Sequence, residues 1–104
     1  MTSPQPVERG LTAPEILGLD TRVQVRQAAF QLLNEMPEGA GRLALDLSQT
    51  RHVDSAGLGV LILIQRRATE RRQRVLLRNP NEELCYLLVL TKMIDLFEVE
   101  PPCP

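Results

Sequence analysis

The side chains best suited to catalysis in this sequence lie close together. His52, Asp54 and Ser55 share one polar segment. A hydroxyl beside an imidazole and a carboxylate could act as the nucleophile of a hydrolase. Neighbours on one loop rarely reach the geometry of a catalytic triad, however, and the sequence has no Gly-x-Ser-x-Gly elbow. We therefore expect no catalytic residue, and the chain is predicted not to be an enzyme.

Ser55 is more informative as a site for phosphate. It stands at the predicted start of a helix, where Gly57 and Gly59 remove side chains and allow another molecule to approach the backbone. Free N–H groups and the helix dipole favour negative charge at that end, so a phosphate on Ser55 could be held there. Two plainer interpretations stay open. Ser55 could simply be the N-cap of the helix, and Asp54 a turn residue.

Three strand–helix pairs are predicted to position this segment. Alternating leucines mark the clearest strand, at 42–48, and residues 58–64 are apolar almost all round, so that half of their helix must be buried. Thr21–Gln24 has the form of a capping box, and Asn79 with Pro80 is typical of a helix start. The predicted order is strand 15–19, helix 25–36, strand 42–48, helix 55–72, strand 74–78 and helix 79–91.

This alternation indicates an α/β fold, in which consecutive strands run parallel and are joined by right-handed crossovers. We expect residues 1–13 to be loosely structured and residues 14–100 to form the single domain. Residues 94–99 offer a last segment that docks on it, and residues 101–104 form a proline-rich tail.

The composition of the chain reduces the number of possible functions. The chain is 43% apolar, as in an ordinary globular protein, and its net charge of −1 argues against binding nucleic acid. Its one histidine and two cysteines cannot make a standard four-ligand zinc site, and no disulfide framework can be read from Cys85 and Cys103. No metal or cofactor is expected.

Targeting signals are also missing from the sequence. The first six residues have neither a basic start nor an apolar stretch, so they do not form a signal peptide. The longest strongly apolar run, 60–64, is far too short to span a bilayer. We expect a cytoplasmic protein that does not insert into a membrane.

The segment Asp54-Ser55-Ala56-Gly57-Leu58-Gly59, following the strand Leu45-Asp46-Leu47, resembles the STAS family. This domain is shared by sulfate transporters and anti-sigma factor antagonists. The resemblance implies a small, mostly parallel sheet with three to four helices packed on it, and its N-terminal hairpin is shortened here. It covers about residues 15–99 and includes Gly18-Leu19-Asp20, Arg78-Asn79-Pro80, Leu90-Thr91 and Leu96-Phe97.

The resemblance also implies a function. In soluble members of the family, the serine after the aspartate is phosphorylated by the anti-sigma factor, which is itself a serine kinase. The unphosphorylated antagonist binds that factor and frees the sigma factor. Ser55 matches the phosphorylated serine, while Asp54 and Asp46 match acidic positions. The partner-binding residues predicted in this way are Asp20, Asp46, Asp54, Ser55, Ala56, Gly57, Leu58 and Gly59.

Other functions remain open on the same fold. The chain could be a soluble subunit bound to the ATPase of a lipid-transporting ABC system, or a scaffold subunit of a signalling assembly. A small ligand-binding or hydrolytic α/β protein is a further alternative. A shortened N-terminus would also leave unpaired backbone groups on an edge strand, which predicts self-association or strand donation through residues 15–19.

Overall fold

A parallel four-stranded sheet forms the centre of the computed structural model, which describes residues 7–104. Its strands lie in the order β1 (Glu8–Thr12), β3 (Arg42–Asp46), β5 (Arg74–Arg78) and β6 (Glu98–Glu100). Two short strands, β2 (Ile16–Leu17) and β4 (His52–Val53), form a separate parallel pair. The helices are α1 (Arg22–Glu35), α2 (Ser55–Glu70), α3 (Glu82–Leu90) and the short 3-10 turn η1 (Ile94–Leu96).

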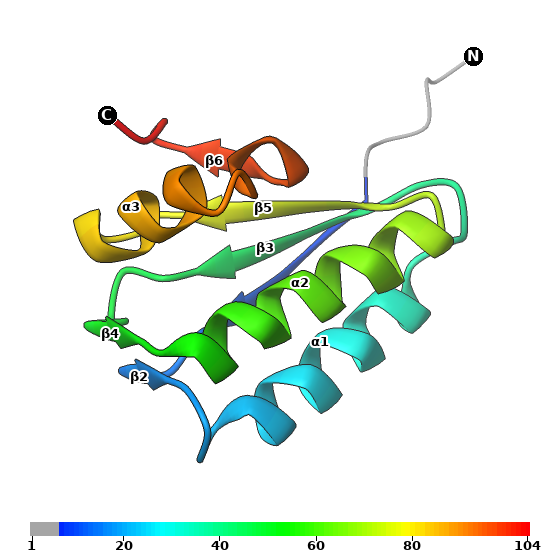
Figure 1. Ribbon diagram of the computed structural model, residues 1–104. Coiled ribbons are helices and arrows are strands. Elements are labelled where there is room, and N and C mark those ends of the chain that lie inside the picture. The colour runs from blue at the N-terminus through cyan, green and yellow to red at the C-terminus, as the bar shows by residue number, and fades with distance from the viewer. Residues whose placement is uncertain (1–6) are drawn as a thin grey trace.

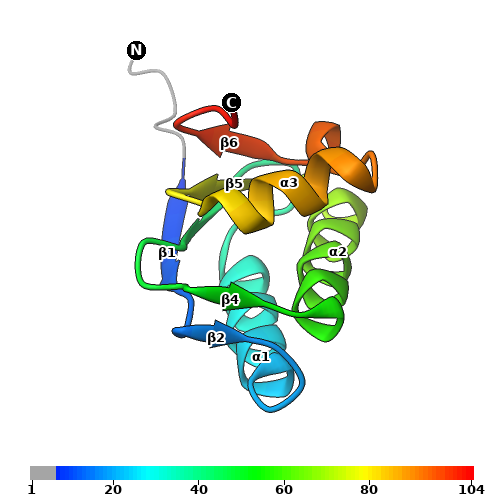
Figure 2. The ribbon, with the colours of Figure 1, turned by 60° about the vertical axis from the view of Figure 1, so that its left-hand side comes forward.

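All three helices lie on one side of the sheet, as Figures 1 and 2 show. Alternate residues of β3 and β5, such as Leu45 and Leu77, point toward them and are fully buried. They pack in one core with Leu33 of α1, Ile64 of α2 and Leu88 of α3. The predicted α/β class and the mostly parallel sheet are therefore confirmed.

The opposite side of the sheet carries a network of ion pairs. Arg42 contacts both Glu8 (Nη2–Oε1, 2.6 Å) and Glu98 (Nη1–Oε2, 3.2 Å) across neighbouring strands. Arg74 and Arg78 add pairs with Glu98 and Glu8. The hydrogen bond from Arg42 lowers the pKa of Glu8 below its ordinary value. These long side chains surround two apolar residues of this face, Ala44 and Leu76, which are buried although the described residues place no helix over them.

The expectation of loose structure before residue 14 is wrong for residues 8–12. They form β1, which pairs in parallel with β3 from Glu8↔Arg42 to Thr12↔Asp46. The segment has one large apolar residue, Leu11, so its own pattern gives no strand signal. Pairing with a central strand and the Glu8–Arg42 contact fix it instead, which is tertiary structure overriding local propensity. Residues 1–6 of the same prediction lie outside the described residues.

The predicted strand 15–19 also has a different place from the one expected. Its ordered part, β2, pairs with β4 and not with β3, whose neighbour on that side is β1. The turn after it differs too, because Thr21 forms no capping box. The Thr21 hydroxyl donates to Ile16 O (2.8 Å) and accepts from Gly18 N (3.0 Å), closing the turn between β2 and α1. Self-association through this segment stays a prediction.

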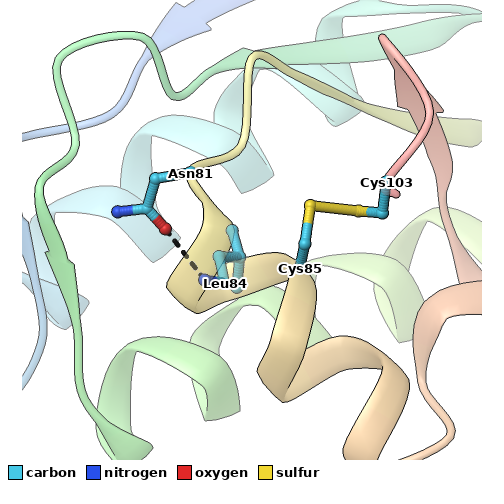
Figure 3. Close-up of a disulfide and its surroundings, with 4 residues drawn as sticks. All are labelled: Asn81, Leu84, Cys85 and Cys103. Atoms are coloured by element: carbon cyan, nitrogen blue, oxygen red, sulfur yellow. Dashed lines mark hydrogen bonds between the residues drawn. A yellow bond between two sulfur atoms is a disulfide. The ribbon is translucent and has the colours of Figure 1, made fainter.

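The start of α3 lies two residues later than predicted. Asn79 adopts a left-handed conformation, with φ of 56°, and is not the cap. The cap is Asn81, whose side-chain oxygen accepts from Leu84 N at 2.8 Å, as Figure 3 shows. The side-chain nitrogen of Asn81 takes no part in the cap and donates to the loop before β4.

A disulfide joins Cys85 on α3 to Cys103 in the tail (Figure 3). The sequence predicted no such bond, because one cysteine lies in an apolar helical run and the other follows prolines. The two meet because β6 returns the chain along β5, which brings the residues after Glu100 back over the start of α3. The proline-rich tail is therefore tied to the domain.

Among residues 7–104, no helix combines the length and the apolar character that crossing a lipid bilayer requires.

Candidate functional site

Asp54, and not Ser55, caps helix α2. One carboxylate oxygen of Asp54 accepts a hydrogen bond from Gly57 N at 2.9 Å, the usual reach from an N-cap into the first turn. The other oxygen accepts from Leu19 N at 3.3 Å, in the loop between β2 and α1. The interpretation of Ser55 as the cap is therefore wrong, and Asp54 is more than a turn residue.

Ser55 is the first residue of α2 and is exposed. Within residues 7–104 its hydroxyl makes no hydrogen bond that stabilises the fold. An exposed hydroxyl at a fixed helix start can be reached by another protein, and the dipole of α2 favours a negative group there. Asp54 already supplies one negative charge to the same turn.

The backbone around Ser55 is fixed by close packing against β2. Asp54 N donates to Leu17 O at 3.2 Å, which extends the β2–β4 pairing to the edge of the helix. Gly57 is buried, and a Cβ atom there would overlap the carbonyl of Leu17; a Cβ at Gly18 would overlap the Asp54 carboxylate. Gly57 therefore lacks a side chain for a reason inside the fold, where the sequence suggested room for a partner.

Gly59 fits the expectation of an open backbone. A Cβ atom at Gly59 would meet no other atom within 4 Å, so nothing inside the domain requires glycine there. Ala56 and Leu58 are half-buried on the same first turns. Of the predicted group, Ala56, Leu58 and Gly59 lie next to Ser55 and remain accessible.

Asp20 and Asp46 have different relations to Ser55. Asp20 is exposed and follows Leu19, whose amide binds Asp54, so it lies on the same edge of the molecule. Asp46 was predicted to be one of the partner-binding residues, and its carboxylate accepts from Ser48 N (3.0 Å) in the turn after β3. It makes no hydrogen bond to residues 52–59. The place of Asp46 in the partner-binding group stays a prediction.

His52 is turned toward another helix. Its Nδ1 lies 3.2 Å from Glu83 Oε1 on α3, while Asp54 is engaged by backbone amides. Both side chains that could form a triad with Ser55 thus have other partners. The geometry gives the hydrolytic interpretation no support.

Sequence reasoning missed the contacts that hold the loop before β4. The Asn81 amide nitrogen donates to Thr50 O (3.2 Å) and Arg51 O (3.0 Å), and so joins the start of α3 to this loop. The buried Thr50 hydroxyl donates to Pro14 O at 2.8 Å. These bonds join segments far apart in the sequence, and only the Asn–Pro–Asn stretch before α3 gave a signal that a cap was near.

The ionisation of Asp54 is tied to this geometry. Hydrogen bonds from the Gly57, Leu19 and Ala56 amides stabilise the carboxylate, with the Gly57 bond the strongest, and together they lower its pKa against the smaller effect of desolvation. A carboxyl group whose pKa is lower in the folded state stabilises the fold above its unfolded pKa of about 3.9. That contribution is lost as the pH falls through the folded value.

We expect Asp54→Asn to lower the urea midpoint of unfolding at pH 7, because the charged cap and its bond to Leu19 are weakened. The difference from wild type should shrink as the pH falls below about 4, the pKa of the unfolded chain, and vanish below the lowered pKa of folded Asp54. Asp95→Asn, at an exposed acid in η1, serves as the control and should change the midpoint little. A wild-type-like midpoint for Asp54→Asn at pH 7 would contradict the capping role.

Known proteins resemble this chain in sequence and in fold. The sequence of residues 5–98 matches the protein family described as "Mlab, STAS domain". The fold is similar to that of a candidate anti-sigma factor antagonist from Thermotoga maritima (TM-score 0.73, 22% identity, covering 91% of this chain and 81% of that one). It is also similar to a sulfate transporter family protein from Wolinella succinogenes (TM-score 0.61, 17% identity, covering 91% and 74%).

No curated protein matches the sequence, so the family assignment depends on the family match and the fold. The family match spans nearly the whole chain, including β1 through η1, and contains Ser55 and its surrounding glycines. Both structural neighbours are covered over about three quarters of their length or more. The chain belongs to the STAS domain family.

Proposed function

We propose that this STAS domain is a phosphorylation-switched, non-catalytic regulator of the anti-sigma factor antagonist type. In its unphosphorylated form it binds an anti-sigma factor that is also a serine kinase, and this binding frees a sigma factor for transcription. Transfer of a phosphoryl group to Ser55 ends the binding. The likeness to the Thermotoga protein, itself described as a candidate antagonist, supports the proposal at the level of fold.

The observation that carries the proposal is the state of Ser55. Its hydroxyl is exposed and makes no hydrogen bond to the described residues, whereas Asp54, Gly57 and Leu17 beside it are all engaged in fixing the loop. A side chain with no structural role on a rigid loop suits modification, because adding a group to it disturbs no internal contact. Its position at the start of α2 also suits a phosphate.

The chemistry requires only the hydroxyl from this chain. The Ser55 Oγ attacks the γ-phosphorus of ATP held by the kinase, the bond to the β-phosphate oxygen breaks, and ADP leaves. The hydroxyl proton passes to a base of the kinase. This chain therefore acts as the substrate of the transfer and the kinase supplies the catalysis.

We propose the cytoplasm as the place of action, because both ATP and the transcription machinery are found there. Disulfides are uncommon in that compartment. The Cys85–Cys103 pair would then be present largely as two thiols, so the domain must keep its fold without the bond. Neither cysteine belongs to the group around Ser55.

The test is phosphorylation by a cognate serine kinase of the anti-sigma factor type. After incubation with that kinase and ATP, mass spectrometry should find one added phosphoryl group, located on Ser55. Ser55→Ala should take up none, while Ser48→Ala, at an exposed serine in the turn after β3, should be labelled like wild type. Labelling of Ser55→Ala at the wild-type rate would refute the assignment of the site.

A second candidate function is support of a transporter. The sequence matches the family described as "Mlab, STAS domain", and the fold is similar to that of a sulfate transporter family protein. The domain would then be a soluble subunit bound to the ATPase of a lipid-transporting ABC system. Affinity purification from the native cell separates the two. Recovery of an ABC ATPase with an unmodified Ser55 favours the transporter, and recovery of a serine kinase favours the antagonist. Recovery of further copies of this chain alone would indicate a scaffold subunit.

A further inference from the structure

A groove runs along the surface between α1 and α2 and begins at the turn that carries Ser55. Figure 1 shows the two helices side by side with their N-terminal ends at the same edge. The groove consists of two adjoining hollows, of about 200 and 300 Å³, which share Leu63 as a lining residue. The first hollow includes Ala56 and Gly59 of the Ser55 helix, and the second extends to Phe30 of α1.

The groove is lined by apolar side chains that the fold leaves uncovered. Leu63 belongs to the run predicted to be buried on all sides, yet 43% of it is exposed. Val23, across the groove on α1, is 46% exposed. Val60 lies at the bottom and is buried. The described residues supply nothing that covers Leu63 and Val23.

Gly59 gives the groove its depth. It lies within α2, where glycine is less favourable than alanine, and it is not required by any internal contact. Gly57, two residues earlier, is different, because a Cβ there would collide with the backbone of β2. The domain thus tolerates a weaker helix at residue 59 and gains an open surface at which another chain can approach the backbone.

The edges of the groove are positively charged. Arg22 and Arg26 line the first hollow, and Arg66 lines the second, where Arg67 also lies and is paired with Glu70. Arg22, Arg26 and Arg66 form no ion pair with a residue between 7 and 104, whereas the arginines on the open face of the sheet are paired with glutamates. The chain as a whole has a net charge of −1, so this positive surface is local.

We propose that the groove binds an amphipathic helix of a protein partner, with apolar side chains in the groove and acidic side chains facing the three arginines. Grooves between helices recognise such segments through residues spaced three and four apart. From Ala56 to Arg66 the groove has room for about three helical turns. The concave shape favours a helix over a membrane surface, which would require Val23 and Leu63 to protrude. The proposal deepens the proposed function, because the groove begins beside Ser55.

The test uses the full chain labelled with ¹⁵N and a synthetic helical peptide of 14 residues, with leucines on one face and glutamates on both sides of it. Titration should give saturable shifts in the amide spectrum, confined to residues 22–30 and 56–66. A peptide with lysine in place of every glutamate should bind at least tenfold more weakly. Absence of saturable shifts, or equal binding of the two peptides, overturns the proposal.

Substitutions in the groove test whether the peptide binds there. Gly59→Leu should fill the first hollow and weaken peptide binding at least tenfold, and the open space at residue 59 means that the variant should fold. Tyr86→Ala, which removes an exposed apolar side chain from α3, is the matched control and should bind like wild type. Gly59→Ala should raise the melting temperature by a few degrees, because alanine strengthens the helix. If a folded Gly59→Leu variant binds the peptide as tightly as wild type, the peptide does not bind in this groove and the proposal is overturned.

Two further outcomes keep this proposal separate from the phosphorylation switch. Binding of the protein to vesicles of anionic phosphatidylglycerol, lost in Gly59→Leu, would show that the groove recognises a membrane and not a helix. Phosphorylation of Ser55 is measured without the peptide, so its failure leaves the peptide result intact. If Ser55 is phosphorylated normally and no peptide binds, the proposal of a helix-binding groove is refuted and the phosphorylation proposal is not.

Discussion

Phosphorylation of Ser55 is expected to lower the affinity for the protein partner by a hundredfold or more while changing the stability of the fold little. The phosphate adds nearly two negative charges to a turn that already carries the Asp54 carboxylate. At a protein interface these charges would face the docked surface and lose water. Like-charge contact or a stranded phosphate costs several kcal/mol there, and about 2.7 kcal/mol is enough for a hundredfold loss.

The fold should tolerate the same charges, because the start of a helix favours a negative group and the Ser55 hydroxyl takes part in no internal hydrogen bond among the described residues. The measurement compares purified phosphoprotein with unmodified protein, by calorimetric titration of the partner and by thermal unfolding. Thr69→Asp adds a charge to the far end of the same helix and is the matched control, which should bind like wild type.

Ser55→Ala should bind constitutively, and Ser55→Asp should fold normally and bind poorly. Aspartate carries less charge than a phosphate, so the phosphoprotein itself decides the outcome. If the phosphoprotein binds its partner as tightly as the unmodified protein, Ser55 is not the switch.

Gly57→Ala is expected to destabilise the domain by about 3 kcal/mol, the upper end of what overpacking usually costs. Gly57 is buried, and the added methyl group would collide with the Leu17 carbonyl and press on Val53 Cγ1, which would lie only 3.1 Å from the new Cβ atom. A backbone carbonyl cannot change rotamer as a flexible side chain can. Relief would require β2 to separate from α2, which would break the Asp54–Leu19 contact as well.

Gly59→Ala is the internal comparison, since it makes the same chemical change two residues away on the same helix. Its Cβ meets no neighbour, so it should stabilise the domain by about 0.5–1 kcal/mol. Urea unfolding of both variants measures the difference. Similar effects of the two substitutions, in either direction, would show that Leu17 does not restrict residue 57.

The central elements were predictable because their patterns are local. The alternating leucines of 42–48 gave β3, and the apolar spacing after Ser55 gave α2. β1 was not predictable, because its residues carry almost no apolar pattern and are held by β3 and by the Glu8–Arg42 pair. The Cys85–Cys103 disulfide was not predicted for a similar reason, because the pairing of β6 with β5 brings the two cysteines together.

The sequence predicted which residues make up the site. The role of each residue depends on the atoms that it contacts, which the sequence does not show. Whether Asp54 or Ser55 caps α2 depends on which of the two has the extended backbone that precedes the helix, and both residue types are common caps. Gly57 and Gly59 look alike in sequence, yet only the position of Leu17 distinguishes a glycine required by packing from one that leaves open surface. Asp46 matched an acidic position, and the residue type alone did not show that its carboxylate accepts a hydrogen bond from Ser48 N.

The parallel arrangement of the strands has a consequence for the order of folding. Within the described sheets, every pair of neighbouring strands is joined by chain that includes a helix, so no pair can form as a local hairpin. The helices can form early, but β2 meets β4 only after α1 has led the chain away and β3 has brought it back, which places Val53 beside Leu17. The backbone around Ser55 is therefore ordered only when these long-range contacts have formed. A nascent or partly folded chain would not present Ser55 in the conformation that a kinase must recognise.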